Sequence, residues 1–244
     1  MSAVYDRIGV GYAELRRPDP RIAALIAAGL GDARTVVNIG AGAGSYEPPS
    51  TVLAVEPSRQ MIDQRAGSAA PAVRGVAGAL PLQDGAVDAT LAVLTTHHWP
   101  DVEQGLAEMA RVSRRQVVAS FDLDELIARL WLCDYLPREV FSAKERSAYQ
   151  ALFATWPGAR VTPIRVPHDC TDGFFAAYWR RPEAYLEPAV HRTVSTFALM
   201  DRGALGSFVA ALRADLEDGT WQARFGHVLE LDELDCGYRL VVNG

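Results

Sequence analysis

The feature that most constrains this chain is a glycine-rich turn directly after a short apolar segment. Residues 35–40 read TVVNIG, a β-branched run typical of a strand buried on both faces of a sheet. The chain continues as GAGAG over 40–44. Glycine permits positive φ in a tight turn and lets the backbone approach a ligand closely. We therefore expect a ligand site at the carboxyl end of this strand.

Strands and helices alternate along the first half of the chain. Beyond 35–40, apolar runs predict strands at 50–56, 73–78, 87–96 and 116–122. Helical spacing and cap residues predict helices at 21–29, 57–66 and 101–114. This alternation is typical of a doubly wound, mostly parallel α/β sheet.

The second half follows a different pattern. Segments 123–155 and 171–217 look helical, whereas 159–167 and 237–243 look like strands six and seven. With 49% hydrophobic residues in 244, we expect a single domain, 1–244. Its α/β core is a Rossmann-like seven-stranded sheet with an enlarged helical cap. The core is expected at 21–122, 159–167 and 236–244, with cap insertions at 123–158 and 168–235.

The first crossover is unusually short. Only residues 45–50 separate the glycine turn from the next strand core, and they include Pro48 and Pro49. Prolines inside a helix remove a donor and clash, so at most one helical turn fits. One sheet face is then thinly covered. We expect the helix at 21–29, the N-terminal arm or the second subunit of a homodimer to cover it.

An acid marks the end of the second predicted strand. Glu56 stands where doubly wound folds place a carboxylate that accepts hydrogen bonds from ribose hydroxyls. The glycine turn plus this acid predicts an adenosine-type ligand. A dinucleotide fits less well, because Ser45 replaces the third glycine or alanine of that fingerprint and Pro48 interrupts the following helix. An NAD-dependent oxidoreductase is thus the least favoured alternative.

Four segments together resemble class I S-adenosylmethionine-dependent methyltransferases that act on small molecules. They read VVNIGAGAGSYE, VLAVEPSRQMI, GALPLQDGAVDATLAVLTTHHWPD and LAEMARVSR, and the resemblance covers residues 5–122. It implies that S-adenosylmethionine is the cofactor and that Gly40 and Gly42 face its methionine moiety. Glu56 would hold the ribose. The remaining cofactor contacts that it implies are Tyr12, Arg17, Pro57, Met61, Ala77, Gly78, Ala79, Leu80, Leu94 and Thr95.

Some positions depart from the pattern of this family. Asn38, Val76 and Gly78 stand where acids are common. This leaves open an alternative, a protein of the same fold that binds the cofactor without methyl transfer, as a cyclase, scaffold or regulator.

Two histidines are the candidate catalytic residues. His97 and His98 directly follow the fourth predicted strand, at the sheet edge where ligands bind. Histidine suits a base at neutral pH, so we expect histidine-assisted transfer, with oxygen slightly preferred over nitrogen or carbon as acceptor. Structural packing of the HHW loop is the alternative interpretation.

Aromatic residues of the cap are candidates for an acceptor pocket, although such residues more often form core. The candidates are Trp131, Tyr135, Phe174 and Tyr178. A second histidine–aspartate group, in the segment VPHDCTDGF, is better explained as a polar turn. Its members are His168, Asp169, Cys170 and Asp172.

Composition excludes several other functions. A net charge of −6 disfavours a nucleic-acid partner. The three separated cysteines indicate reduced thiols and no metal site. We find no signal-peptide pattern and no apolar run long enough to cross a membrane. We therefore expect a cytoplasmic enzyme with a small-molecule substrate.

Overall fold

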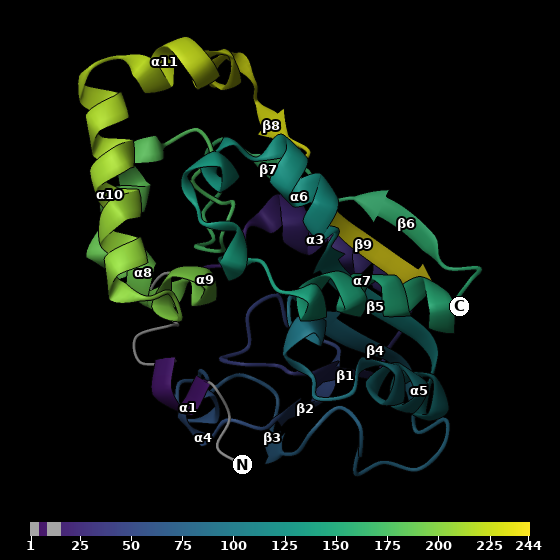
Figure 1. Ribbon diagram of the computed structural model, residues 1–244. Coiled ribbons are helices and arrows are strands. Elements are labelled where there is room, and N and C mark those ends of the chain that lie inside the picture. The colour runs from purple at the N-terminus through teal and green to yellow at the C-terminus, as the bar shows by residue number, and fades with distance from the viewer. Residues whose placement is uncertain (1–4, 9–15) are drawn as a thin grey trace.

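The computed structural model describes residues 5–8 and 16–244. Its main sheet has seven strands in the order β3-β2-β1-β4-β5-β9-β6 (Figure 1). The first five strands along the chain pair in parallel, and β9 lies antiparallel between β5 and β6. The strands are β1 Val36–Ile39, β2 Thr51–Glu56, β3 Ala72–Arg74, β4 Val87–Val93, β5 Ser113–Phe121, β6 Arg160–Pro163 and β9 Tyr238–Asn243. The prediction of a mostly parallel seven-stranded α/β fold is confirmed.

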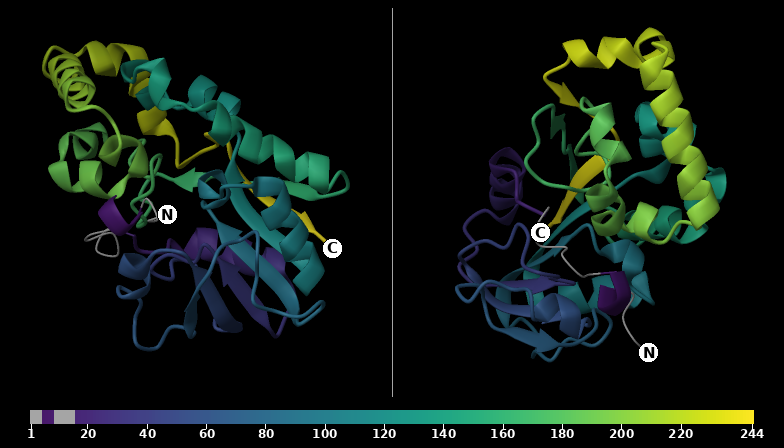
Figure 2. Two further views of the ribbon diagram at one scale, coloured as in Figure 1. Left: turned by 60° about the horizontal axis from the view of Figure 1, so that its bottom comes forward. Right: turned by 90° about the vertical axis from the view of Figure 1, so that its left-hand side faces the viewer.

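Short helices account for much of the remaining chain. The α-helices of the core are α1 Tyr5–Ile8, α3 Pro20–Leu30, α4 Arg59–Ile62 and α5 Val102–Val112. Those of the cap are α6 Leu123–Arg129, α7 Ala143–Thr155, α8 Pro188–Thr193, α9 Ser195–Ala198, α10 Arg202–Glu217 and α11 Thr220–Phe225. The single-turn 3₁₀ segments are η1 Thr96–His98, η2 Trp131–Tyr135, η3 Arg138–Val140, η4 Pro182–Leu186 and η5 Gly226–Glu230. Helices α8 to α11 gather on one side of the molecule, away from β1, β2 and β3 (Figure 2).

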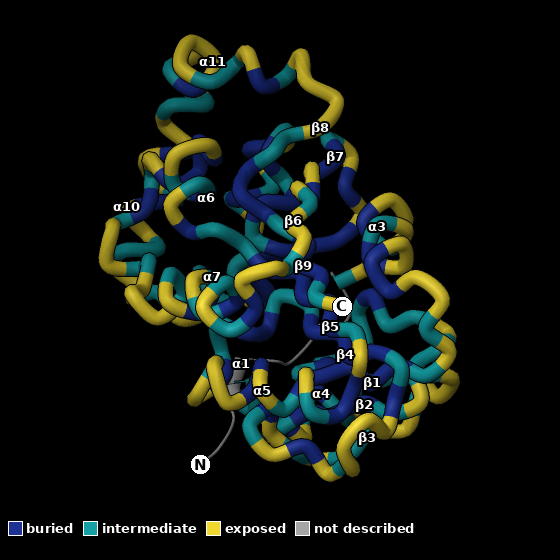
Figure 3. The backbone as a smooth tube through the Cα atoms, turned by 90° about the vertical axis from the view of Figure 1, so that its right-hand side faces the viewer, coloured by how far each residue is buried: buried dark blue, intermediate teal, exposed yellow. Residues whose placement is uncertain are grey.

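Helix α3 begins where the sequence predicts. Asp19 is the N-cap and accepts a hydrogen bond from the Arg21 amide at 3.0 Å, while Pro20 occupies the first turn. Ile22 and Ile26 of α3 are buried in one hydrophobic cluster with residues of β1, β4, β5 and β9. The opposite face of the sheet packs against α5 and α7. The central strands β1, β4, β5 and β9 between these layers are mostly buried, whereas the edge strands β3 and β6 are not (Figure 3).

The first crossover contains no helix, as predicted from its prolines. Tyr46 of this crossover packs into the core instead. Its side chain is buried in the same cluster as α3, its φ is 59°, and its hydroxyl accepts a hydrogen bond from the Asp19 amide at 3.2 Å. The thinly covered face is therefore closed by α3 and Tyr46 within one chain.

Three predicted elements differ from the structure. The predicted strand at 73–78 ends at Arg74, and the predicted helix at 57–66 is reduced to α4. The predicted strand at 159–167 divides into β6 and β7 Val166–Pro167. Strand β7 pairs instead with β8 Glu233–Leu234, outside the main sheet.

Candidate functional site

The glycine turn lies at the carboxyl edge of the sheet, immediately after β1. Gly40, Gly42 and Gly44 have φ angles of 64°, 53° and 95°. A Cβ atom on Gly40 would lie 2.1 Å from the Thr95 hydroxyl, which comes from the turn after β4. Glycine at position 40 is therefore required both by backbone conformation and by the close approach of two strand ends.

Glu56 ends β2 beside this turn. Its carboxylate accepts one hydrogen bond from the Gly42 amide and one from the Ser58 amide, both at 2.8 Å. Burial raises the pKa of Glu56, and the two amide donors oppose that shift. The carboxylate is thus fixed in orientation and keeps lone pairs for further donors, such as hydroxyl groups.

The other residues assigned to the adenine ring lie on both sides of this edge. Met61 is buried, and its Cε lies 3.2 Å from the place where a Cβ on Gly42 would be. Pro57 is half-buried. In the loop after β3, Ala77 and Leu80 are buried in the cluster with α5, Gly78 is half-buried and Ala79 is exposed.

The N-terminal segment contributes residues that the sequence did not single out. Tyr12 lies outside the described residues, and Arg17 is exposed. Arg16 lies in the wall of a cavity and pairs with Asp172, Nε to Oδ1, at 2.7 Å. No local pattern could have identified this pair, because the partners are 156 positions apart.

Helix α1 joins two parts of the site. The Tyr5 hydroxyl is 3.2 Å from His98 Nε2, and a carboxylate oxygen of Asp6 accepts a hydrogen bond from the Ser58 hydroxyl at 2.7 Å. Ser58 is two positions beyond Glu56. Helix α1 therefore connects the turn after β4 with the end of β2.

His97 and His98 follow Leu94 and Thr95 after β4. Their rings are tilted by 48° to one another with centroids 3.9 Å apart, and the rings of Phe121 and His97 meet edge-on at 5.1 Å. His97 Nδ1 is buried and has no hydrogen-bond partner within the described part of the chain. Burial lowers the pKa of His97 well below its ordinary range and lowers that of His98 to about 4. Both imidazoles are neutral at physiological pH.

A cavity opens between this edge of the sheet and the cap. The cavity encloses about 70 Å³, and the space counted together with its opening to solvent is about 630 Å³. Its wall contains His97 and Leu94 from the predicted site and Phe174 from the predicted acceptor pocket. The other lining residues are Tyr5, Arg16, Phe121, Leu123, Leu126, Phe141, Glu145, Phe175, Thr193, Val194, Ser195, Thr196 and Tyr238.

The other three residues predicted for the acceptor pocket do not line this cavity. Trp131 is buried in the cap, where its indole donates a hydrogen bond to the Trp179 carbonyl at 2.7 Å. The Tyr135 hydroxyl donates to Asp215 at 2.7 Å. Tyr178 packs edge-on against the ring of Tyr185. These aromatic side chains form the interior of the cap. Their spacing in the sequence could not distinguish this structural role from a place in the acceptor pocket.

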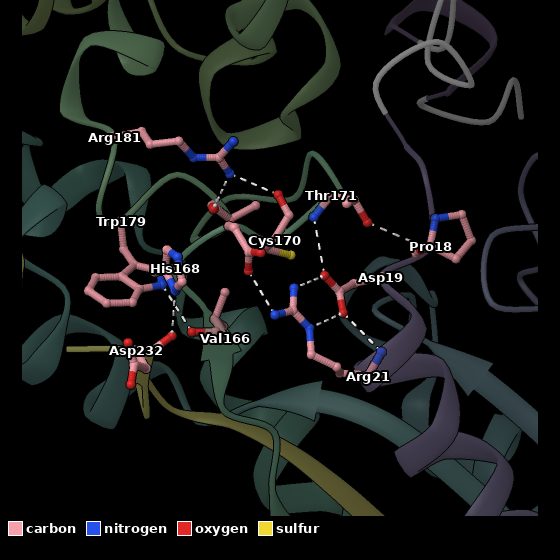
Figure 4. Close-up of polar contacts among 12 residues, drawn as sticks. Pro18, Asp19, Arg21, Val166, His168, Cys170, Thr171, Trp179, Arg181 and Asp232 are labelled. Atoms are coloured by element: carbon pink, nitrogen blue, oxygen red, sulfur yellow. Dashed lines mark hydrogen bonds and ion pairs between the residues drawn. The ribbon is translucent and has the colours of Figure 1, made fainter.

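The segment 168–172 fastens the cap to α3 (Figure 4). Arg21 pairs with Asp169 at 2.7 Å, and the Thr171 amide donates to Asp19 at 3.2 Å. His168 Nδ1 lies 3.2 Å from the Asp232 carbonyl, on the far side from α3. These contacts support the interpretation of this segment as a structural turn.

Two negative observations concern the described residues. Across 5–8 and 16–244, no three histidine, cysteine, aspartate or glutamate side chains are grouped closely enough to hold a metal ion. Within the same ranges, no helix has the length and apolar character that crossing a bilayer requires.

Comparison with known proteins identifies relatives. A family model for a methyltransferase domain matches residues 29–121. A crystal structure from Anabaena variabilis, described as a candidate methyltransferase from an antibiotic biosynthesis pathway, is 32% identical. It superposes with a TM-score of 0.84 over 94% of this chain and 99% of that chain.

Two further similarities are more limited. An uncharacterised methyltransferase of Mycobacterium tuberculosis is 38% identical over 89 residues, 34% of this chain and 36% of that protein. The match thus spans about a third of the length of such curated relatives. The [4+2]-cyclase SpnF shares the fold alone, at 14% identity and a TM-score of 0.52 over 98% of this chain and 93% of that chain.

The Anabaena structure shares sequence and fold over nearly the whole of both chains. Together with the methyltransferase-domain match over the glycine turn, Glu56 and the histidine turn, it identifies the family. This chain belongs to the class I S-adenosylmethionine-dependent methyltransferases.

Proposed function

We propose that this protein transfers a methyl group from S-adenosylmethionine to a small molecule held in the cavity between the sheet edge and the cap. The relative from Anabaena variabilis, described as belonging to an antibiotic biosynthesis pathway, supports a small-molecule acceptor. The single observation that carries the proposal is the position of His97. Its side chain lies in the cavity wall, and among residues 5–8 and 16–244 its buried Nδ1 has no hydrogen-bond partner.

The residues at the carboxyl edge suit this cofactor. The turn around Gly40 has no room for a side chain, which lets a ligand approach the backbone. The Glu56 carboxylate is held by two amides and suits the ribose hydroxyls as donors. We assign the methionine moiety to Gly40 and Gly42. When bound, S-adenosylmethionine supplies a methyl group activated by a sulfonium.

The acceptor site adjoins the cofactor site through consecutive residues of one turn. Thr95 packs beneath Gly40, and Leu94 lines the cavity. The cap excludes water and holds the acceptor in line with the methyl group, which is the main requirement for this displacement.

His97 then acts on the acceptor. A neutral imidazole can take the proton that an acceptor hydroxyl loses as it attacks. Because the pKa of His97 is depressed, it is a weak base, so its action requires the hydroxyl to become acidic in the transition state. This arrangement favours oxygen over nitrogen as the methylated atom.

The test measures S-adenosylhomocysteine released from S-adenosylmethionine in the presence of phenols, amines and carboxylic acids. We expect turnover with a hydroxyl-bearing acceptor. His97→Ala should reduce it by about 100-fold or more without weakening cofactor binding. His168→Ala is the matched control, because His168 lies outside the cavity, and it should retain turnover.

Two outcomes would contradict the proposal. If His97→Ala is as active as the native protein, His97 does not act on the acceptor. If the protein binds S-adenosylmethionine but releases no S-adenosylhomocysteine with any class of acceptor, the non-transferring alternative replaces methyl transfer.

A further inference from the structure

Six rings form a continuous row that runs along the wall of the acceptor cavity. In order they belong to Tyr5, His98, His97, Phe121, Tyr238 and Phe174, with successive centroids 5.2, 3.9, 5.1, 6.0 and 5.0 Å apart. All except His98 line the cavity. The row is assembled from α1, η1, β5, β9 and the loop after β7, so it is not a by-product of one helix or strand.

This row differs from the aromatic interior of the cap. Trp131 is buried against Tyr185 and Trp221, and none of these three side chains lines the cavity. In contrast, Tyr5, His97 and Phe121 are only partly buried by the protein itself. Their remaining surface is therefore available to a ligand. Aromatic rings favour other rings in edge-to-face or offset arrangements.

The charged side chains of the cavity wall, Arg16 and Glu145, already have polar partners in the protein. The side chains of Arg16 and Asp172 are 8% and 0% exposed, and two guanidinium nitrogens of Arg16 meet both carboxylate oxygens of Asp172, at 2.7 and 3.1 Å. Glu145 Oε2 accepts hydrogen bonds from the amide and hydroxyl of Ser142, at 2.9 and 3.1 Å, in the capping box of α7. The depressed pKa values keep both histidines neutral.

We propose that the acceptor is a neutral, planar aromatic molecule whose single reacting polar group meets His97. This inference rests on the proposed function and narrows its substrate class. An anionic acceptor would lose water on entering the cavity, and the guanidinium of Arg16 is already paired with Asp172. An ammonium group would in addition face the positive charge of the sulfonium. An aliphatic ring would fill the space but lose the edge-to-face contacts.

The test compares four probes of similar size: naphthol, hydroxynaphthoic acid, naphthylmethylamine and the saturated alcohol decalinol. Their affinities are measured by calorimetry with and without saturating S-adenosylhomocysteine. We expect naphthol to bind at least tenfold more tightly than each of the other three. Equal or tighter binding of the carboxylate, the amine or decalinol would overturn the proposal.

A pair of variants locates the site. Phe174→Leu keeps apolar volume but removes one ring of the row, so it should weaken naphthol at least fivefold and leave decalinol unchanged. Phe153→Leu is the matched control, because Phe153 lies on α7 outside the cavity, and it should change neither affinity. Equal effects of the two variants on naphthol would refute the assignment of the cavity.

Failure of this inference is distinguishable from failure of the proposed function. Absence of S-adenosylhomocysteine binding contradicts the proposed function, while the ranking of the four probes on the free protein still decides the acceptor class. Normal S-adenosylhomocysteine binding with no preference for naphthol overturns only the acceptor class.

Discussion

At Gly40, both the backbone conformation and the close packing require glycine. Its φ is 64°, and a Cβ there would lie 2.1 Å from the Thr95 hydroxyl. We expect Gly40→Ala to lower the free energy of unfolding by about 2 kcal/mol or more, from positive-φ strain plus overpacking. It should also weaken S-adenosylhomocysteine at least tenfold, because Thr95 must shift. Urea denaturation and calorimetry measure the two effects.

Gly85 supplies the matched control for Gly40. Its φ is 60°, and a Cβ there would meet nothing within 4 Å. Gly85→Ala should therefore cost only the strain of the backbone, about 1 kcal/mol, and leave ligand affinity unchanged. If the two variants behave alike, the contact with Thr95 has no role in shaping the site.

His98 links stability to pH. Its pKa in the folded protein is about 4, below its ordinary value of 6.5, because burial disfavours the charged ring. The unfolded chain therefore binds a proton that the folded chain does not, and the free energy of unfolding falls as pH decreases from about 6.5 towards 4. We expect this group alone to remove roughly 2 kcal/mol between pH 7 and pH 5.

Urea denaturation at both pH values tests this linkage. His97 contributes in the same direction, since its pKa is also lowered. His98→Gln should thus reduce the pH dependence without abolishing it. The same pH dependence in His98→Gln and the native protein would show that His98 titrates normally in the fold.

Residues of the site differ in how far sequence could identify them. Gly40, Gly42 and Glu56 lie at or just after the ends of predicted strands. The local pattern therefore predicts that they meet, and the structure brings them together. The pair of Arg16 and Asp172 depends on how the cap folds back, which no local pattern encodes. For the same reason, the sequence alone could not show that Phe174 lines the cavity and that Trp131 does not.

A buried ion pair joins the first crossover to a residue that follows α4. Arg65 and Glu47 are 5% and 7% exposed and lie 2.7 Å apart. Glu47 also accepts a hydrogen bond from the Asn38 side-chain amide at 3.2 Å, and Arg65 reaches the Gly42 carbonyl at 3.5 Å. An acid at position 38 would meet Glu47, which explains physically why this chain carries asparagine there.

This pairing gives a test based on exchange of charge. Glu47→Gln removes the counter-charge of Arg65 and should cost about 3–5 kcal/mol in unfolding free energy. Asn38→Asp should also destabilise, by repulsion of Glu47. The double variant should be more stable than the sum of the single effects by about 1 kcal/mol or more, since one carboxylate remains. Additive effects in urea denaturation would contradict the coupling of these side chains.

Elements with strong local signals were predictable, and those fixed by tertiary contacts were not. The Asp19 cap and Pro20 define the start of α3, and Pro48 and Pro49 exclude a crossover helix. Strand β6 ends at Pro163, and β7 pairs with β8 instead of joining the main sheet, a pairing between distant segments. The hydrophobic pattern alone predicts neither the pairing of β6 with β9 nor that of β7 with β8.

At the scale of the whole molecule, the segments of the cap lie between strands of the main sheet along the chain. Strand β9, near the end of the chain, lies between β5 and β6, so the sheet is completed only after the cap has been passed (Figure 3). The acceptor cavity takes residues from α1, the sheet edge and the cap. Formation of the cavity therefore requires the complete fold.

The central claim is that the carboxyl edge of this sheet binds S-adenosylmethionine through Glu56. Calorimetric titration of the native protein and Glu56→Gln with S-adenosylmethionine and S-adenosylhomocysteine tests it most directly. We expect saturable one-to-one binding of both ligands by the native protein. Loss of the ribose contacts should weaken both at least tenfold in Glu56→Gln, about 1.4 kcal/mol. No binding by the native protein, or equal affinity in the variant, would contradict the claim.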